Sequence, residues 1–259
     1  MIKWFIILFF SWWFFLPAEL IGGESADPIH EMLSEAATLY ENGNEEKALR
    51  LYSDILQRAP RNYEALWNSS LLTTRKGQRQ QNSTDEVFYY EKAREIARTC
   101  MRYHPNKPRS YYVYGIATAA LVDDMPNSSE RFKLIWKIKE YADKAVEMDP
   151  DYAPAWHLLG VWHSKLSKIS TAERFAARLL YGRLPDGASK EKAEEYLLRS
   201  IRMEPDEILF QLDLGQHHQE FGEHSKAIPI LEQVLAMNPK SENDHHYQRE
   251  ARERLESLR

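Results

Sequence analysis

Cysteine is almost absent from this sequence, since Cys100 is the single cysteine among 259 residues. An intramolecular disulfide is therefore excluded, and packing must stabilise the fold. Cys100 lies at a small-residue position of a predicted helix, which favours a buried thiol over a nucleophile. The 10 glycines are scattered, and no glycine-rich phosphate loop, G-x-S-x-G elbow, HExxH motif or paired-carboxylate site is present. We therefore expect no enzymatic activity and no cofactor.

An excess of basic charge is also missing. The 34 Lys and Arg residues against 39 Asp and Glu residues give a formal net charge of -5. Nothing in this balance indicates a nucleic-acid partner or an anionic membrane surface.

The longest hydrophobic stretch, from Trp4 to Leu16, is too short for a membrane-spanning helix, which needs about 20 residues. It follows Lys3 and ends before Pro17, the pattern of a secretory signal. We therefore interpret residues 1–23 as a signal peptide, with an uncleaved membrane anchor as the alternative, and residues 24–259 as the folded domain. An exported protein is expected, with the bacterial periplasm as a working inference.

Prolines that end helical segments recur along the remaining sequence. Pro60, Pro105, Pro150, Pro205 and Pro239 are 45, 45, 55 and 34 residues apart, and an alanine stands 12 residues before four of them. In the last unit, apolar residues at helical spacing follow Gly222 and Ala227. These units resemble the tetratricopeptide repeat (TPR) of 34 residues, in which small residues let two helices approach and proline ends the second.

The resemblance implies an all-α solenoid of about five helix pairs with a C-terminal capping helix. The expected repeats span about residues 29–62, 63–107, 108–152, 153–207 and 208–241, and the capping helix spans about 243–258. Asn44, Ser83 and Ser170 are the expected N-caps. Repeats two to four exceed the usual 34 residues, so inserted helices are expected in each of them.

The insertion in repeat four has a distinctive composition. Ala172, Phe175, Ala176, Leu179 and Leu180 follow helical spacing, while the polar side is basic, with Lys165, Lys168, Arg174 and Arg178. Such a helix fits an anionic partner or lipid head groups. The alternative is that its apolar side packs on a neighbouring repeat and its charges are merely solvated.

Several blocks narrow the resemblance. They are EALW at Glu64–Trp67, HLLGVW at His157–Trp162, FAARLLYGRLP at Phe175–Pro185 and the polar SENDHHYQREA before the last helix. Over about residues 60–258, these blocks resemble the regulator of microtubule dynamics family. The resemblance implies a non-enzymatic helical-repeat protein, and some family members are membrane-anchored and credited with phospholipid binding. An exported chain would not meet cytosolic microtubules.

In TPR proteins the concave groove is lined by first-helix positions. By this analogy, the groove residues here are Trp67, Leu71, Tyr112, Ile116, His157 and Val161. A largely apolar groove favours a protein or peptide partner, with phospholipid as the alternative and with no nucleic acid expected. Lys165, Lys168, Arg174 and Arg178 would form its basic rim. The alternative is that the inserted helices fold into the groove and fill it, because an exposed apolar trough favours aggregation.

Several histidines are candidate metal ligands. His217, His218 and His224 offer helical spacing together with Glu220, and His245 and His246 form another pair. No recognised metal motif accompanies them, so a packing role is expected and no metal site is predicted.

Overall fold

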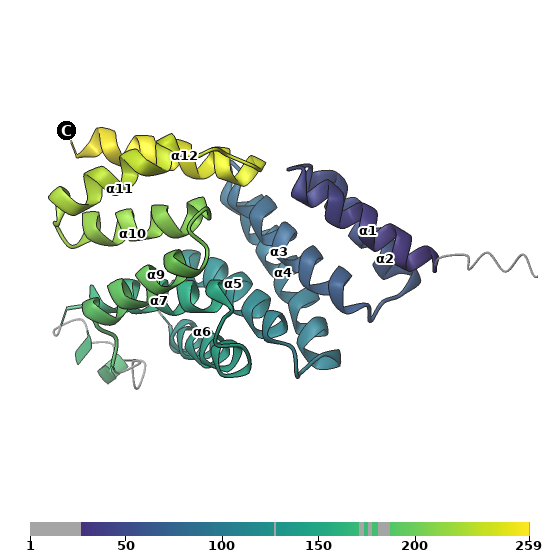
Figure 1. Cartoon of the computed structure of the whole chain (residues 1–259). Coiled ribbons are helices and arrows are strands. Elements are labelled where there is room, and N and C mark those ends of the chain that lie inside the picture. Colours follow the sequence, from purple (N-terminus) through teal and green to yellow (C-terminus); the bar gives the residue numbers. More distant parts are fainter. Residues whose placement is uncertain (1–26, 127, 171–173, 176–177, 181–186, 259) are drawn as a thin grey trace, which may run out of the picture.

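The computed structural model describes residues 27–126, 128–170, 174–175, 178–180 and 187–258. The predicted signal or anchor segment, 1–23, lies outside the described residues. The described helices are α1 (Pro28–Glu41), α2 (Glu45–Arg58), α3 (Tyr63–Gln78), α4 (Ser83–Tyr103), α5 (Pro108–Asp124), α6 (Ser129–Met148), α7 (Ala153–Ser167), α9 (Lys190–Met203), α10 (Ile208–Glu220), α11 (His224–Ala236) and α12 (Glu242–Ser257). The predicted all-α helical-repeat solenoid is confirmed, and Figure 1 shows its antiparallel helix pairs stacked side by side.

Small residues let the two helices of each pair approach closely. A Cβ atom on Gly160 of α7 would lie 2.7 Å from Leu197 Cγ on α9, and one on Gly215 of α10 would lie 2.8 Å from Leu231 on α11. Ala193 and Ala227 on the partner helices are fully buried. The glycine and alanine positions of the repeat pattern are therefore the positions where the helices touch.

The expectation of inserted helices in repeats two and three is wrong. The surplus residues of these repeats form no helix between α3 and α4 or between α5 and α6, where the described chain has only short turns. Instead they lengthen the second helices, since α4 has 21 residues and α6 has 20, against 14 in α2. Buried Tyr90, Ala93, Ala97 and Cys100 keep helical spacing along α4, so nothing in the sequence interrupts it.

The predicted helix caps hold only in part, since Asn44 is the N-cap residue of α2, as predicted, but Ser83 does not cap α4. The Asn44 side chain makes no capping hydrogen bond, and α4 is capped by Asn82 rather than Ser83, with the Asn82 side chain accepting from the amide of Asp85. In repeat four, Arg174, Phe175, Arg178, Leu179 and Leu180 have helical conformation. Residues 171–173, 176–177 and 181–186, which include Ala172, Glu173 and Ala176, lie outside the described residues.

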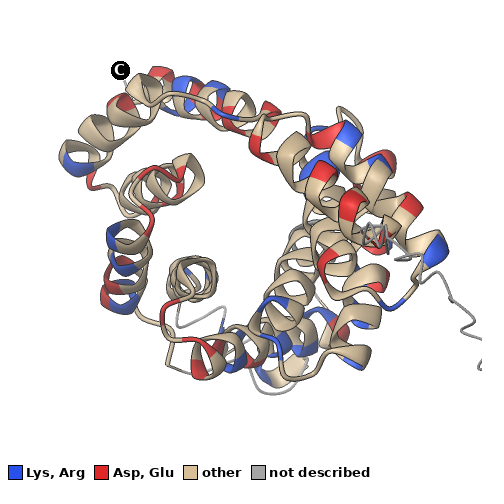
Figure 2. Ribbon diagram, turned by 45° about the vertical axis from the view of Figure 1, so that its right-hand side comes forward, with Lys and Arg blue, Asp and Glu red and all other residues tan. Residues whose placement is uncertain are grey.

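The solenoid curves until its two ends meet. Figure 2 shows the helices arranged as a ring around a central opening. The start of α12 lies beside the N-terminal pairs, and α12 runs from there to the C-terminus beside the end of α10. In the part of the chain that the structure describes, no helix has the length and apolar character needed to cross a bilayer.

Candidate functional site

The inner surface of the ring holds a cavity of about 460 Å³. Its floor comes from the first helices α3, α5, α7 and α10, as the TPR analogy predicts. The rest of its lining comes from α4, through Glu86 and Tyr90, and from α12, through His246, Tyr247, Glu250 and Arg254. The last helix therefore does more than cover the open end of the solenoid, and this contribution was not foreseen from the sequence.

Five of the six predicted groove residues line this cavity. They are Leu71, Tyr112, Ile116, His157 and Val161. Trp67 does not line the cavity. It packs against the central core cluster, and the Arg109 guanidinium lies 4.9 Å from the centre of its ring.

The cavity is more polar than the sequence indicated. His157 Nε2 lies 2.7 Å from Asp213 Oδ2, and the imidazole stacks on Phe210 at 4.5 Å. Further charged side chains reach the lining from several helices: Arg75, Glu86, Lys165, Glu250 and Arg254. The expectation of a largely apolar groove is thus wrong, because α4, α10, α12 and the ends of α3 and α7 add charges of both signs.

Two tyrosines from different helices line the cavity. Tyr112 on α5 and Tyr247 on α12 are buried, and desolvation raises the pKa of both phenols well above the usual value. Desolvation also raises the pKa of the nearby Glu207 carboxyl. These groups stay protonated more readily than in water, so the phenols serve as hydrogen-bond donors and apolar surfaces.

The four residues of the predicted basic rim are not equivalent. Lys165 lines the cavity, whereas Lys168 pairs with Glu220 at 3.1 Å. The Arg174 guanidinium donates to the carbonyl oxygens of Leu166 and Ile169, where α7 ends. Arg178 is exposed, beside the exposed side chains of Leu179 and Leu180. Arg174 thus caps a helix instead of facing a partner.

A polar network joins the two ends of the ring. Glu45, which is 1% exposed, accepts from Arg75 at 2.8 Å and from Arg79 at 2.6 Å. Arg79 also donates to the Asn243 side chain on α12. Asn243 and Tyr247 both donate to Gln78 Oε1, at 3.1 and 3.2 Å. We call this set the end-to-end contact: Glu45, Arg75, Gln78, Arg79, Asn243 and Tyr247.

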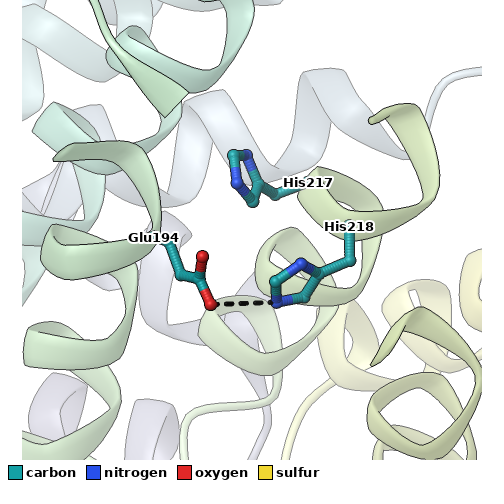
Figure 3. Close-up of side chains that lie close together, drawn as sticks. All are labelled: Glu194, His217 and His218. Carbon is teal, nitrogen blue, oxygen red and sulfur yellow. Dashed lines mark ion pairs between the residues drawn. The ribbon is translucent and has the colours of Figure 1, made fainter. Parts of the chain in front are cut away.

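The predicted histidine group is assembled differently from the expectation. His217 and His218 come together with Glu194 of α9, and the three side chains face one another in Figure 3. Glu220 pairs with Lys168, and His224 is exposed at the start of α11. His245 and His246 lie on α12 and are not members of this group.

Cys100 is fully buried, as predicted, with Sγ 3.3 Å from Ser110 Oγ. Desolvation raises the pKa of its thiol to about 11, so the thiolate is scarce at neutral pH.

Two buried histidines predict a pH-dependent stability. Desolvation lowers the pKa of both His163 and His217 to about 4. In the unfolded chain their pKa returns to about 6.5. The unfolded state therefore binds more protons between these values, so their stabilising effect is complete above about pH 6.5 and is lost as the pH falls towards 4.

We expect the free energy of unfolding to fall by about 1–2 kcal/mol per histidine between about pH 7 and pH 5. Urea titrations at the two pH values measure it. His163→Gln should reduce the difference, whereas His30→Gln, at an exposed position, should leave it unchanged. An equal difference in the wild type and His163→Gln would contradict the assignment.

The comparisons with known proteins agree with this architecture. The family model described as regulator of microtubule dynamics protein 1-3 matches residues 32–259. The chain belongs to this family. The match extends the resemblance seen in the sequence, which began at about residue 60, into the first repeat.

Individual relatives are distant. Regulator of microtubule dynamics protein 1 of Mus musculus is 25% identical over 234 residues, which cover 89% of this chain and 75% of the mouse protein. The Bos taurus protein of the same name is 26% identical over 178 residues, which cover 68% of this chain and 55% of the bovine protein. The alignment thus spans about half of the bovine relative.

A solved structure shows the same fold. A thermophilic TPR protein from Thermus thermophilus superposes with a TM-score of 0.61 and 20% sequence identity. The superposition covers 86% of this chain and 98% of the other. The superposition therefore shows that this chain has the TPR fold.

Proposed function

We propose that this protein is a binding module whose central cavity holds a short peptide segment of a partner protein. The observation that supports the proposal is the convergence of Leu71, Tyr112, Ile116, His157 and Val161 in one cavity. Its volume of about 460 Å³ falls within the usual range for ligand sites. This volume is what leads us to propose a short peptide segment as the ligand.

The lining indicates the chemistry of the peptide. Ile116, Val161 and Tyr112 offer an apolar and aromatic surface for one side chain of the peptide, the anchoring mode that dominates many interfaces. Arg254 and Glu86 add charges of opposite sign to the lining. We therefore expect a segment with one apolar anchor flanked by charged or polar residues, and no strong preference for an acidic tail.

Phospholipid binding is the second candidate, and a different observation favours it. Phe175, Leu179 and Leu180 are 64%, 71% and 71% exposed, and exposed Arg178 lies among them. An apolar side with a basic neighbour is typical of helices that lie on a membrane surface. If residues 1–23 anchor the chain in a membrane, the protein would be held at a bilayer surface, where the exposed Phe175, Leu179 and Leu180 would be available to lipid.

The cavity proposal predicts that filling the space abolishes peptide binding. Ala119 and Ala120 line the cavity, so the indole of Ala119→Trp would occupy it. Peptides selected from a random display library against the wild type should bind the variant at least about tenfold more weakly, because the anchor loses its space. Lys133→Trp, on the exposed side of α6, is the matched control and should bind as the wild type does.

Two outcomes would contradict the peptide proposal. Selected peptides that bind Ala119→Trp and the wild type equally well occupy another surface. A library that yields no binders, together with phospholipid detected by native mass spectrometry on the wild type but not on Ala119→Trp, would assign the cavity to lipid.

A further inference from the structure

The group formed by Glu194, His217 and His218 has the composition of a metal site. One ligand atom from each side chain lies within 4.8 Å of the other two. Glu194 belongs to α9 and the histidines to the end of α10, so the group joins repeat four to repeat five. Figure 3 shows the carboxylate facing the His218 ring, with the His217 ring alongside.

His217 supplies the second, independent observation. Its side chain is 0% exposed, and its Nε2 atom is buried without a hydrogen-bond partner among the described residues. Its other nitrogen, Nδ1, lies 2.8 Å from Ser164 Oγ. If Nδ1 donates to the serine hydroxyl, the lone pair on Nε2 is free to bind a cation. Buried polar atoms in folded proteins nearly always have a partner, so this nitrogen requires one.

His218 is oriented as metal-binding histidines usually are. Its Nδ1 lies 2.7 Å from Glu223 Oε2, which leaves Nε2 directed towards Glu194 Oε1 at 3.8 Å. A carboxylate behind the imidazole fixes the tautomer and increases the basicity of the nitrogen that faces the metal. Ser164 holds His217 in a corresponding way.

We propose that Glu194, His217 and His218 bind a divalent transition-metal ion of the zinc class. Two imidazole nitrogens and one carboxylate oxygen suit Zn²⁺, Co²⁺ or Ni²⁺ better than Mg²⁺ or Ca²⁺, which prefer oxygen ligands alone. Three protein ligands leave a fourth position for water. The ion would link α9 to α10 in addition to their packing.

The ligand atoms need only a small movement to bind the ion. In a tetrahedral zinc site with bonds of about 2.0–2.1 Å, the ligand atoms lie about 3.4 Å apart. Glu194 is the movable member, because its side chain is 32% exposed, whereas the two imidazoles are fixed by burial. The lowered pKa of His217, about 4 through desolvation, keeps its imidazole neutral at physiological pH.

Lys226 competes with the proposed ion. Its ammonium lies 3.3 Å from Glu194 Oε1 and 3.5 Å from Glu223 Oε2, and Lys190 also pairs with Glu223, at 2.6 Å. A metal ion must therefore displace Lys226 or use the other carboxylate oxygen. Removing the lysine charge should strengthen metal binding.

Titration of the full chain, without a histidine tag, with Zn²⁺ tests the proposal. We expect one ion per chain, no competition by Mg²⁺, and a Co²⁺ complex whose visible spectrum indicates imidazole coordination. Glu194→Gln should weaken Zn²⁺ binding by at least about tenfold, whereas Glu195→Gln, at the exposed neighbouring position, should change it by less than about twofold. Lys226→Gln should bind Zn²⁺ more tightly than the wild type.

The proposal is overturned if the wild type binds no Zn²⁺. It is also overturned if Glu194→Gln binds as tightly as Glu195→Gln, which would place the ion at another group such as His245 and His246. Circular dichroism of each variant separates loss of a ligand from loss of the fold, because Glu194 lies at the surface edge of the group and its replacement should leave the helices intact.

Discussion

Replacing Glu45 with glutamine should lower the free energy of unfolding by about 3–5 kcal/mol. The Glu45 carboxylate is 1% exposed, and both of its oxygens are paired, one with Arg75 and one with Arg79. The arginine side chains are only 14% and 18% exposed. Glutamine would leave the largely buried Arg75 guanidinium without its carboxylate, and would leave Arg79 with only the exposed Glu242, at 3.4 Å. Such a loss costs far more than loss of a surface ion pair.

The adjacent residue offers a matched control. Glu46 is 56% exposed, and its pairs with Arg50 and Lys76 are 3.5 and 3.9 Å long. Glu46→Gln should therefore change the unfolding free energy by no more than about 0.5 kcal/mol. Urea denaturation of both variants measures the difference. Equal stabilities of Glu45→Gln and Glu46→Gln would show that the Glu45 pairs contribute nothing to the end-to-end contact.

Replacing Gly43 with alanine should destabilise the fold by about 2–4 kcal/mol. Gly43 has φ of +76° in the turn between α1 and α2, a conformation that alanine adopts only with strain. A methyl group there would also overlap the carbonyl oxygen of Lys240, in the turn that leads into α12. The new Cβ atom is held rigidly by the backbone, and the Lys240 carbonyl is itself backbone. The clash can therefore be relieved only by moving the two ends of the ring apart.

A matched substitution at Gly222 separates the backbone strain of alanine from its clash with Lys240. It occupies the equivalent turn between α10 and α11, with φ of +72°, and a Cβ atom there would meet nothing within 4 Å. Both turns close with the same backbone hydrogen bond, from Asn44 N to Leu39 O and from Glu223 N to His218 O, each 2.8 Å long. Gly222→Ala should therefore cost only the conformational strain, about 1 kcal/mol.

The difference between the two alanine variants measures the clash with Lys240. Thermal or urea unfolding of both proteins gives it directly. If Gly43→Ala and Gly222→Ala lose equal stability, the turn after α1 does not press against the turn before α12, and the ring is open in solution.

Sequence periodicity predicted the helix pairs and most of the cavity floor. The proline and alanine spacing fixed the phase of each repeat, and the phase decides which side of a first helix faces inward. Trp67 shows the limit of this reasoning, because an aromatic ring at an inward position can instead pack between two first helices beneath an arginine such as Arg109.

The repeat pattern in the sequence does not predict that the solenoid closes into a ring. It depends on the accumulated rotation between successive pairs, which no single repeat encodes. Asn243, fully buried, and Tyr247 look like ordinary residues of a polar terminal helix until Gln78 and Arg79 are placed beside them. Glu194 likewise joins the two histidines only after α9 and α10 are packed together.

The end-to-end contact gives this repeat protein an unusual folding problem. In an open solenoid each repeat touches only its neighbours, so folding can begin anywhere and stability is nearly a sum over repeats. Here Arg79 and Asn243 are 164 residues apart in the chain. Bringing them together carries the entropic cost of closing a long loop, and such distant contacts slow folding. The first and last repeats should consequently unfold as one cooperative unit, so that removing α12 loosens α1 and α2 on the far side of the sequence.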